Sequence, residues 1–147
     1  DVDHAISRGR NCLVLTRRVV HLEILTNHLA ALGHQALVMQ GGMSAKARRA
    51  VVDRLADAQV GDGVLVIGTT PFIGEGFDAP ALDTLFLAAP IALDGLLVQC
   101  AGRVVRAAPG KDLAEVDDYH DPAVPLLADA LRRRMPGYRA LRFTRSS

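Results

Sequence analysis

The chain alternates between two hydrophobic patterns. Short, continuous apolar runs of strand length occur at residues 12–16, 36–39, 64–67 and 84–88. Runs without polar alternation are typical of strands that are buried on both faces of a parallel sheet. Apolar residues at helical spacing lie between the runs, which favours βα units with right-handed crossovers. The pattern therefore predicts an α/β fold, a parallel sheet with helices on both faces.

Turn and capping residues indicate where the helices begin and end. A first helix is expected to finish at Gly9, and Gly33 is placed to cap the second, because glycine adopts the left-handed conformation without strain. The apolar face of the second helix is predicted to consist of Val20, Ile24, Leu25, Leu29 and Leu32. Ser44 is a favourable N-cap for a third helix, whose predicted apolar face contains Ala47, Val51, Val52 and Leu55. Later elements are predicted as a helix at 93–106, an edge strand at 113–119 and a terminal helix at 122–135.

Composition adds a few constraints. With 147 residues, half of them apolar, the chain fits a single domain at 1–147 with a sizeable core. The net charge of +1 gives no overall electrostatic attraction for nucleic acid, although it is compatible with a local phosphate-binding surface. Cys12 and Cys100 lack metal-ligand spacing, so we expect reduced thiols and no metal site. Without a membrane-length apolar run or a signal peptide, we expect a cytoplasmic protein with no membrane partner, and the opening Asp1 favours an excised domain.

The segment 74–80, GEGFDAP, follows the third strand-length run and contains two glycines that permit close approach of a ligand. Parallel sheets bind ligands in the loops at the carboxyl ends of their strands. Asp78 can accept hydrogen bonds from ribose hydroxyls, and Thr69 or Thr70 can donate one to a phosphate.

A predicted helix further along the chain places Arg103 and Arg106 on one face, three residues apart. Two guanidinium groups in that arrangement repel each other unless an anion lies between them. Phosphate suits the position, because arginine binds it in a bidentate manner and stays charged. The alternative is a structural ion-pair network with Asp78 or Asp83.

These two segments resemble motifs V and VI of the second RecA-like domain of superfamily 2 helicases, a T…GEGFDAP element followed by QxxGRxxR. The resemblance implies that Arg103 and Arg106 act as arginine fingers toward the ATP γ-phosphate. It also implies that the nucleotide is approached by Gly76, Asp78 and Gln99. Within the superfamily, the segments EGFDAP and LDTLFLAAP resemble those of a bacterial Rad25-like group of DEAD/DEAH-type helicases.

The resemblance also identifies candidates that contact the nucleic-acid backbone. Thr69 best matches the motif V threonine, and Thr70 stays an alternative because the spacing to the glycine is one residue longer than in DEAD-box relatives. The family's usual aspartate after that threonine is absent. LVLT with its following arginines resembles motif IV, and MQGGMS resembles an HGGMS element with Gln40 in place of histidine. These turns add as candidates Thr16, Arg17, Gly41 and Gly42.

The implied function is the C-terminal half of an ATP-dependent nucleic-acid helicase or translocase, with a RecA-like fold of the P-loop NTPase type. The chain contains neither a GxxxxGK[ST] loop nor a DExH pair, so an N-terminal RecA-like domain of the same protein would bind most of ATP and Mg²⁺. The isolated domain is therefore expected to be inactive. DNA is slightly favoured over RNA as the track.

The sequence offers two alternative functions. A non-catalytic RecA-like binding or scaffold module would have no electrostatic reason to keep both arginines of QxxGRxxR, and a flavodoxin-like enzyme gives no account of that helix. The arginine-rich helix at about 122–145 fits a nucleic-acid track, a docking face for another domain, or a solvated helix end whose cations complement the dipole.

Overall fold

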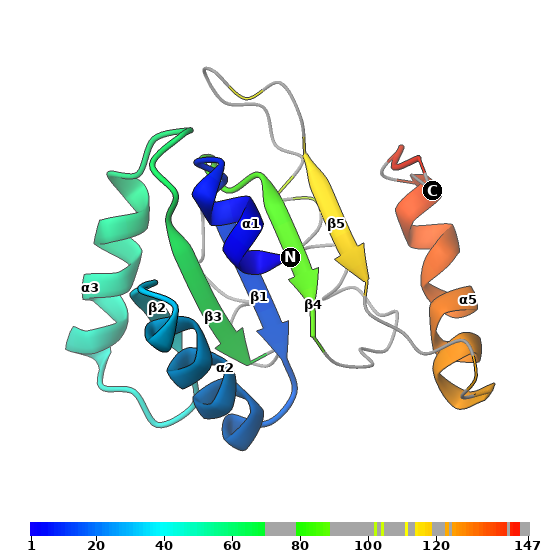
Figure 1. Ribbon diagram of the computed structural model, residues 1–147, viewed down its shortest axis with the longest axis horizontal. Helices are drawn as coiled ribbons and strands as arrows, with labels where there is room; N and C mark the ends of the chain where they lie inside the picture. The colour runs from blue at the N-terminus through cyan, green and yellow to red at the C-terminus, as the bar shows by residue number, and fades with distance from the viewer. Residues whose placement is uncertain are drawn as a thin grey trace.

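A computed structural model of the chain describes residues 1–69, 79–88, 102, 104, 111, 114–118, 123, 125–140 and 142–144. The helices in these segments are α1 (Val2–Ser7), α2 (Val19–Ala31), α3 (Ala45–Ala56) and α5 (Pro125–Ala140). The strands are β1 (Cys12–Thr16), β2 (Ala36–Met39), β3 (Leu65–Thr69), β4 (Thr84–Leu87) and β5 (Glu115–Asp118). All of these strands pair in parallel, in the order β2-β3-β1-β4-β5 (Figure 1).

The sheet has a hydrophobic cluster on each face, because successive strand residues point to opposite sides. Leu13 and Leu15 of β1 belong to the cluster that also contains residues of α3 and α5. Cys12 and Val14, which alternate with them, belong to the cluster that contains residues of α1 and α2. The predicted fold class, a parallel sheet with helices on both faces, is therefore confirmed.

The predicted apolar face of α2 is wrong at three positions. Val20 is 65% exposed, Ile24 58% and Leu32 50%. The predicted Leu29 is buried, and with it the helix buries Leu22, which was not predicted. The helix has apolar residues on two sides, and the sheet can cover only one of them. The stripe that the sheet covers contains residues seven apart. Hydrophobic periodicity alone does not tell this stripe from the other apolar side of the helix.

Helix α3 begins as predicted. The Ser44 side chain accepts a hydrogen bond from the Ala47 amide at 3.1 Å, which satisfies one of the free donors of the first turn. Val51 and Leu55 are buried against the sheet, whereas Ala47 is exposed, so the contact is confined to the later turns.

Helix α5 starts later than the predicted residue 122 and continues through Pro136, past the predicted end at residue 135. Proline removes one helical hydrogen bond, but tertiary contacts hold the turns on either side. Arg134 donates to both carboxylate oxygens of Asp118, each at 2.6 Å, and the Tyr138 hydroxyl donates to the same carboxylate at 2.7 Å. The anchor spans the proline and fixes α5 beside β5.

The end of α5 is a Schellman motif. The amide of Phe143 donates to the carbonyl of Tyr138 at 3.0 Å, and the amide of Arg142 to that of Arg139 at 2.9 Å. The two aromatic rings meet edge to face, with centroids 6.2 Å apart. Arg142 has φ 62°, in the left-handed region that glycine usually occupies at this position. A side chain in that conformation costs roughly 1–2 kcal/mol.

None of the described helices is both long and apolar enough to cross a membrane.

Candidate nucleic-acid and nucleotide interface

The carboxyl ends of the strands meet at one edge of the sheet, because all pairs are parallel (Figure 1). The register pairs Thr16 at the end of β1 with Thr69 at the end of β3. Met39 of β2 pairs with Gly68, so Gln40 comes next in the same row. Three predicted motifs therefore lie side by side along this edge, from residues far apart in sequence.

The two threonines of this row are less accessible than the sequence suggests. Thr16 is fully buried, and its hydroxyl lies 3.5 Å from His21 Nδ1 at the start of α2. Thr69 is 5% exposed. Arg17, the next residue after β1, has an exposed side chain. At this edge Arg17 is therefore more accessible than the adjacent Thr16 to a ligand that approaches from solvent.

The predicted Gly-Gly turn is exposed at both positions. Gly42 has φ +83°, and a Cβ built there would meet nothing within 4 Å. The glycine is therefore required by backbone conformation, and the space above it is open to a ligand. The backbone N–H of Gln40 donates to Met43 Sδ at 3.3 Å, which closes the turn.

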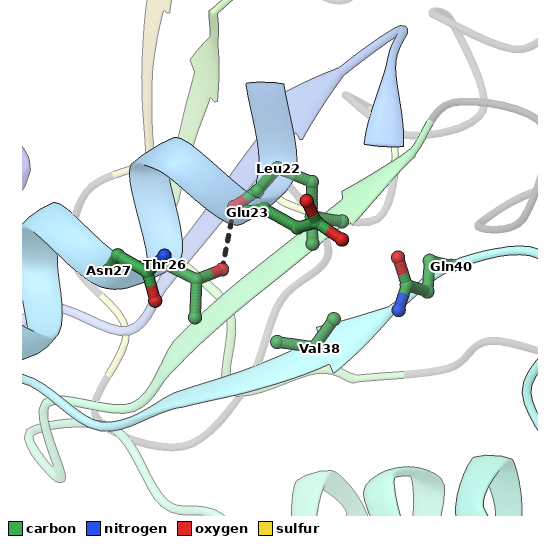
Figure 2. A pocket seen from close by; sticks show the side chains of 6 residues that line it. All are labelled: Leu22, Glu23, Thr26, Asn27, Val38 and Gln40. Carbon is green, nitrogen blue, oxygen red and sulfur yellow. Dashed lines mark hydrogen bonds between the residues drawn. The ribbon is translucent and has the colours of Figure 1, made fainter. Parts of the chain in front are cut away.

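A hollow of about 350 Å³ lies between α2 and β2 (Figure 2). Its lining consists of Leu22, Glu23, Thr26, Asn27, Val38 and Gln40. The Glu23 carboxylate extends toward Gln40, whose Oε1 is the one buried side-chain oxygen without a hydrogen-bond partner in the described part of the chain. A carboxylate at this point disfavours phosphate. The sequence indicated only that Gln40 replaces a histidine, and it did not single out the α2 residues.

The predicted nucleotide-facing residues all lie outside the described residues, and so does the nucleic-acid candidate Thr70. The five nucleotide-facing residues are Gly76, Asp78, Gln99, Arg103 and Arg106. Within the predicted motif VI helix, Gly102 and Val104 are described, and both are helical. Val104 is fully buried in the cluster shared with α3 and α5. The assignment of the two arginines therefore stays a prediction.

Asp83, the alternative ion-pair partner for those arginines, lies at the opposite edge of the sheet. Its carboxylate lies 3.1 Å from Arg10 Nε, and both side chains are largely buried. Arg10 also donates to Thr84 Oγ1 at 2.9 Å and lies 3.5 Å from Glu115. This network joins β1, β4 and β5 where the strands begin.

Asn11 and Cys12 extend the same amino-terminal edge. The Asn11 amide group donates to the carbonyls of Gln59 and Ala81, and its oxygen accepts from the Val64 amide at 2.8 Å. Burial, with a smaller contribution from the charge of Asp83, raises the pKa of the Cys12 thiol to about 12. The thiol is therefore free, neutral and inert, as expected for a reduced core cysteine.

The arginine-rich helix divides into two groups that the sequence did not separate. Arg134 is buried and has the structural role described above. Arg132 and Arg133 are exposed and both pair with Asp129, at 3.2 and 2.9 Å. Arg139 is also exposed. Only the exposed group is available to a partner.

The five parallel strands and their order define a RecA-like α/β domain. The family described as Helicase conserved C-terminal domain matches residues 2–108, and the chain belongs to that family. No curated protein matches the sequence.

Solved structures agree on the fold. The chain is similar to the C-terminal part of the Fun30 ATPase domain, at 14% identity and a TM-score of 0.68, over 88% of this chain and 40% of that one. It is similar to the C-terminal domain of the DEAD-box protein Dbp5, at 14% identity and 0.65, over 90% and 70%. It is also similar to T4 UvsW, at 17% identity and 0.70, over 95% and 31%. The chain thus spans well under half of the Fun30 and UvsW structures.

Proposed function

We propose that this domain is the second RecA-like half of a superfamily 2 ATP-dependent helicase or translocase, close to the Rad25-like group. The observation that supports the proposal most is the family match over a segment that ends in QxxGRxxR. A helicase domain that had lost turnover would have no need for two guanidinium groups on one helical face.

In this proposal the domain completes an ATP site formed with an N-terminal RecA-like domain. Arg103 and Arg106 would face the γ-phosphate, and Asp78 the ribose. Gly76 would allow close backbone approach, and Gln99 would hydrogen-bond the nucleotide. This donor set fits one half of a nucleotide site, since it contains no phosphate loop. ATP and Mg²⁺ would be held mainly by the partner domain, and bound Mg²⁺ would neutralise charge on the phosphates.

Nucleic acid would pass along the carboxyl edge of the sheet. Arg17 is exposed there, and Gly41 and Gly42 form an exposed turn. Backbone amides and arginine are common phosphate donors, and such contacts fix position without reading sequence. Thr16 and Thr69 would contribute after a shift that exposes their hydroxyls, and Thr70 stays the alternative to Thr69. DNA is favoured slightly over RNA as the track.

ATP hydrolysis by the full-length protein tests this proposal. We expect turnover to rise with single-stranded DNA, duplex DNA or RNA, and the polymer that stimulates it is the track. Arg106→Ala should lower turnover by about 10³–10⁵-fold, the range that arginine fingers contribute in related phosphoryl transfers, while strand binding persists. Arg8→Ala removes an exposed arginine near the amino edge and should leave turnover unchanged.

Two results would change the conclusion. Unchanged turnover in Arg106→Ala would remove the finger assignment. Absence of turnover under every condition would favour the non-catalytic scaffold module, with the arginines reassigned to structural ion pairs.

A further inference from the structure

The exposed side of α5 and the turn that ends it present a group of arginines that the proposed site does not use. We call this group the α5 arginine face, and its members are Arg132, Arg133, Arg139 and Arg142. The side chains of Arg132 and Arg133 are 76% and 77% exposed. Arg132 and Arg139 are seven residues apart, which places them on the same side of the helix.

The face has a large excess of positive charge. Asp129 is the one acidic residue of α5, and it is shared by Arg132 and Arg133. Among the described residues, neither Arg139 nor Arg142 has a carboxylate at ion-pair distance. The charge of these two arginines is therefore available to an anionic partner.

The face is also held rigidly. The buried pair between Arg134 and Asp118, with the Tyr138 hydroxyl, fixes the inner side of α5 to the end of β5. From there the helix runs against the strand direction, beside the β5 edge of the sheet (Figure 1). Long side chains on a fixed helix lose less entropy on binding than the same side chains on a free tail.

Arg142 gives an independent indication of function. It is the one non-glycine residue with positive φ in the described part of the chain, and it occupies the Schellman position where glycine is preferred. In the described part of the chain, the exposed Arg142 side chain makes no hydrogen bond or ion pair that would compensate for the strain. A residue that breaks a local rule without a structural gain is expected at a functional position.

We propose that the α5 arginine face binds the phosphate backbone of nucleic acid, outside the path along the carboxyl edge. This inference rests on the proposed function, because it assumes that the protein acts on nucleic acid. Arginine binds phosphate in a bidentate manner and stays charged. Arg132 and Arg139 are roughly 10 Å apart along the helix, so both can reach the backbone of one nucleic-acid strand. The contact does not depend on the nucleotide sequence, and it adds to the affinity of the protein for nucleic acid.

Salt-dependent binding to the full-length protein tests the proposal. Affinities for fluorescently labelled single-stranded DNA, duplex DNA and RNA would be measured between low and moderate salt. The double variant Arg139→Ala/Arg142→Gly should bind more weakly, and its plot of log K against log salt should be shallower by about 0.7–0.9 for each lost contact. Arg8→Ala/Arg54→Ala removes the same charge from exposed positions elsewhere and should keep the wild-type slope.

The single variant Arg142→Gly separates binding from folding. Glycine relieves the left-handed strain, so the thermal midpoint should stay equal or rise by roughly 2–4 °C, while affinity falls. A wild-type slope in the double variant overturns the inference, even if nucleic acid stimulates ATP turnover. If the wild-type protein binds no nucleic acid, the inference and the proposed function both fail. Loss of binding to an acidic protein alone, with nucleic-acid affinity intact, assigns the face to protein docking and also overturns the inference.

Discussion

Neutralising Asp118 tests how the terminal helix is attached to the sheet. The Arg134 side chain is 1% exposed and that of Asp118 10%, so the pair is shielded from water. Asp118→Asn keeps the shape of the side chain but removes its charge. The buried guanidinium group would then lose the charge of its bidentate acceptor, and the Tyr138 hydroxyl would lose a charged acceptor. Breaking a buried pair in this way costs about 3–5 kcal/mol.

The assay is urea unfolding of the chain, followed by circular dichroism. A loss of about 3–5 kcal/mol is a large share of the roughly 5–15 kcal/mol available to a domain, so the midpoint should move clearly. Tyr138→Phe keeps the ion pair and should cost less, about 1.5–3 kcal/mol, for one hydrogen bond to a charged group.

Arg132→Met is the matched surface control. Its ion pair with Asp129 is exposed, and such pairs contribute about 0–1 kcal/mol. If Asp118→Asn costs no more than Arg132→Met, the pair does not anchor α5 as the burial indicates.

Three further predictions concern the rest of the fold. Ser44→Ala should lower the free energy of unfolding by about 0.5–2 kcal/mol in the same urea assay, because the first turn of α3 loses its side-chain cap. Leu22→Ala should cost about 2–5 kcal/mol and Ile24→Ala less than about 0.5 kcal/mol, and equal losses would contradict the observed orientation of α2. Because the folded pKa of Cys12 is raised from 9.0 to about 12, its contribution is fully present below pH 9 and is lost as pH rises toward 12. The free energy of unfolding should therefore fall by about 1.4 kcal/mol per pH unit in that window, and Cys12→Ala should flatten the slope.

The strands could be predicted closely because their signal is local. The runs at 12–16 and 36–39 coincide with β1 and β2, since each is unbroken, apolar and bounded by turn residues. The third run was placed at 64–67, whereas β3 is Leu65–Thr69 and continues as far as its pairing with β1. The end of a strand depends on its neighbour, which is information that a local pattern does not contain.

The orientation and ends of the helices could not be predicted from local sequence alone. Which side of α2 faces the sheet is decided by packing, because both sides are apolar. The continuation of α5 past Pro136 depends on Asp118, which lies in a different element. For the same reason the sequence could not tell the buried Arg134 from its exposed neighbours.

The candidate site was predicted in part. Parallel pairing was enough to bring Thr16, Thr69 and the Gly-Gly turn to one edge, as expected from strand polarity alone. The burial of Thr16 against His21 was not predictable, since it depends on how α2 begins. The nucleotide-facing residues stay predictions.

The polar network at the amino-terminal edge has a consequence for how the family can diversify. A single side chain, Asn11, holds three backbone segments, while Arg10 ties the starts of β4 and β5 to β1. Strand register is thereby set from the rim that faces away from the predicted ligands. Loops on the other rim, such as the Gly-Gly turn, can be lengthened or replaced without loosening the sheet. Changes of ligand would accumulate at one end of the domain, and substitutions at Asn11 would be rejected whatever the ligand.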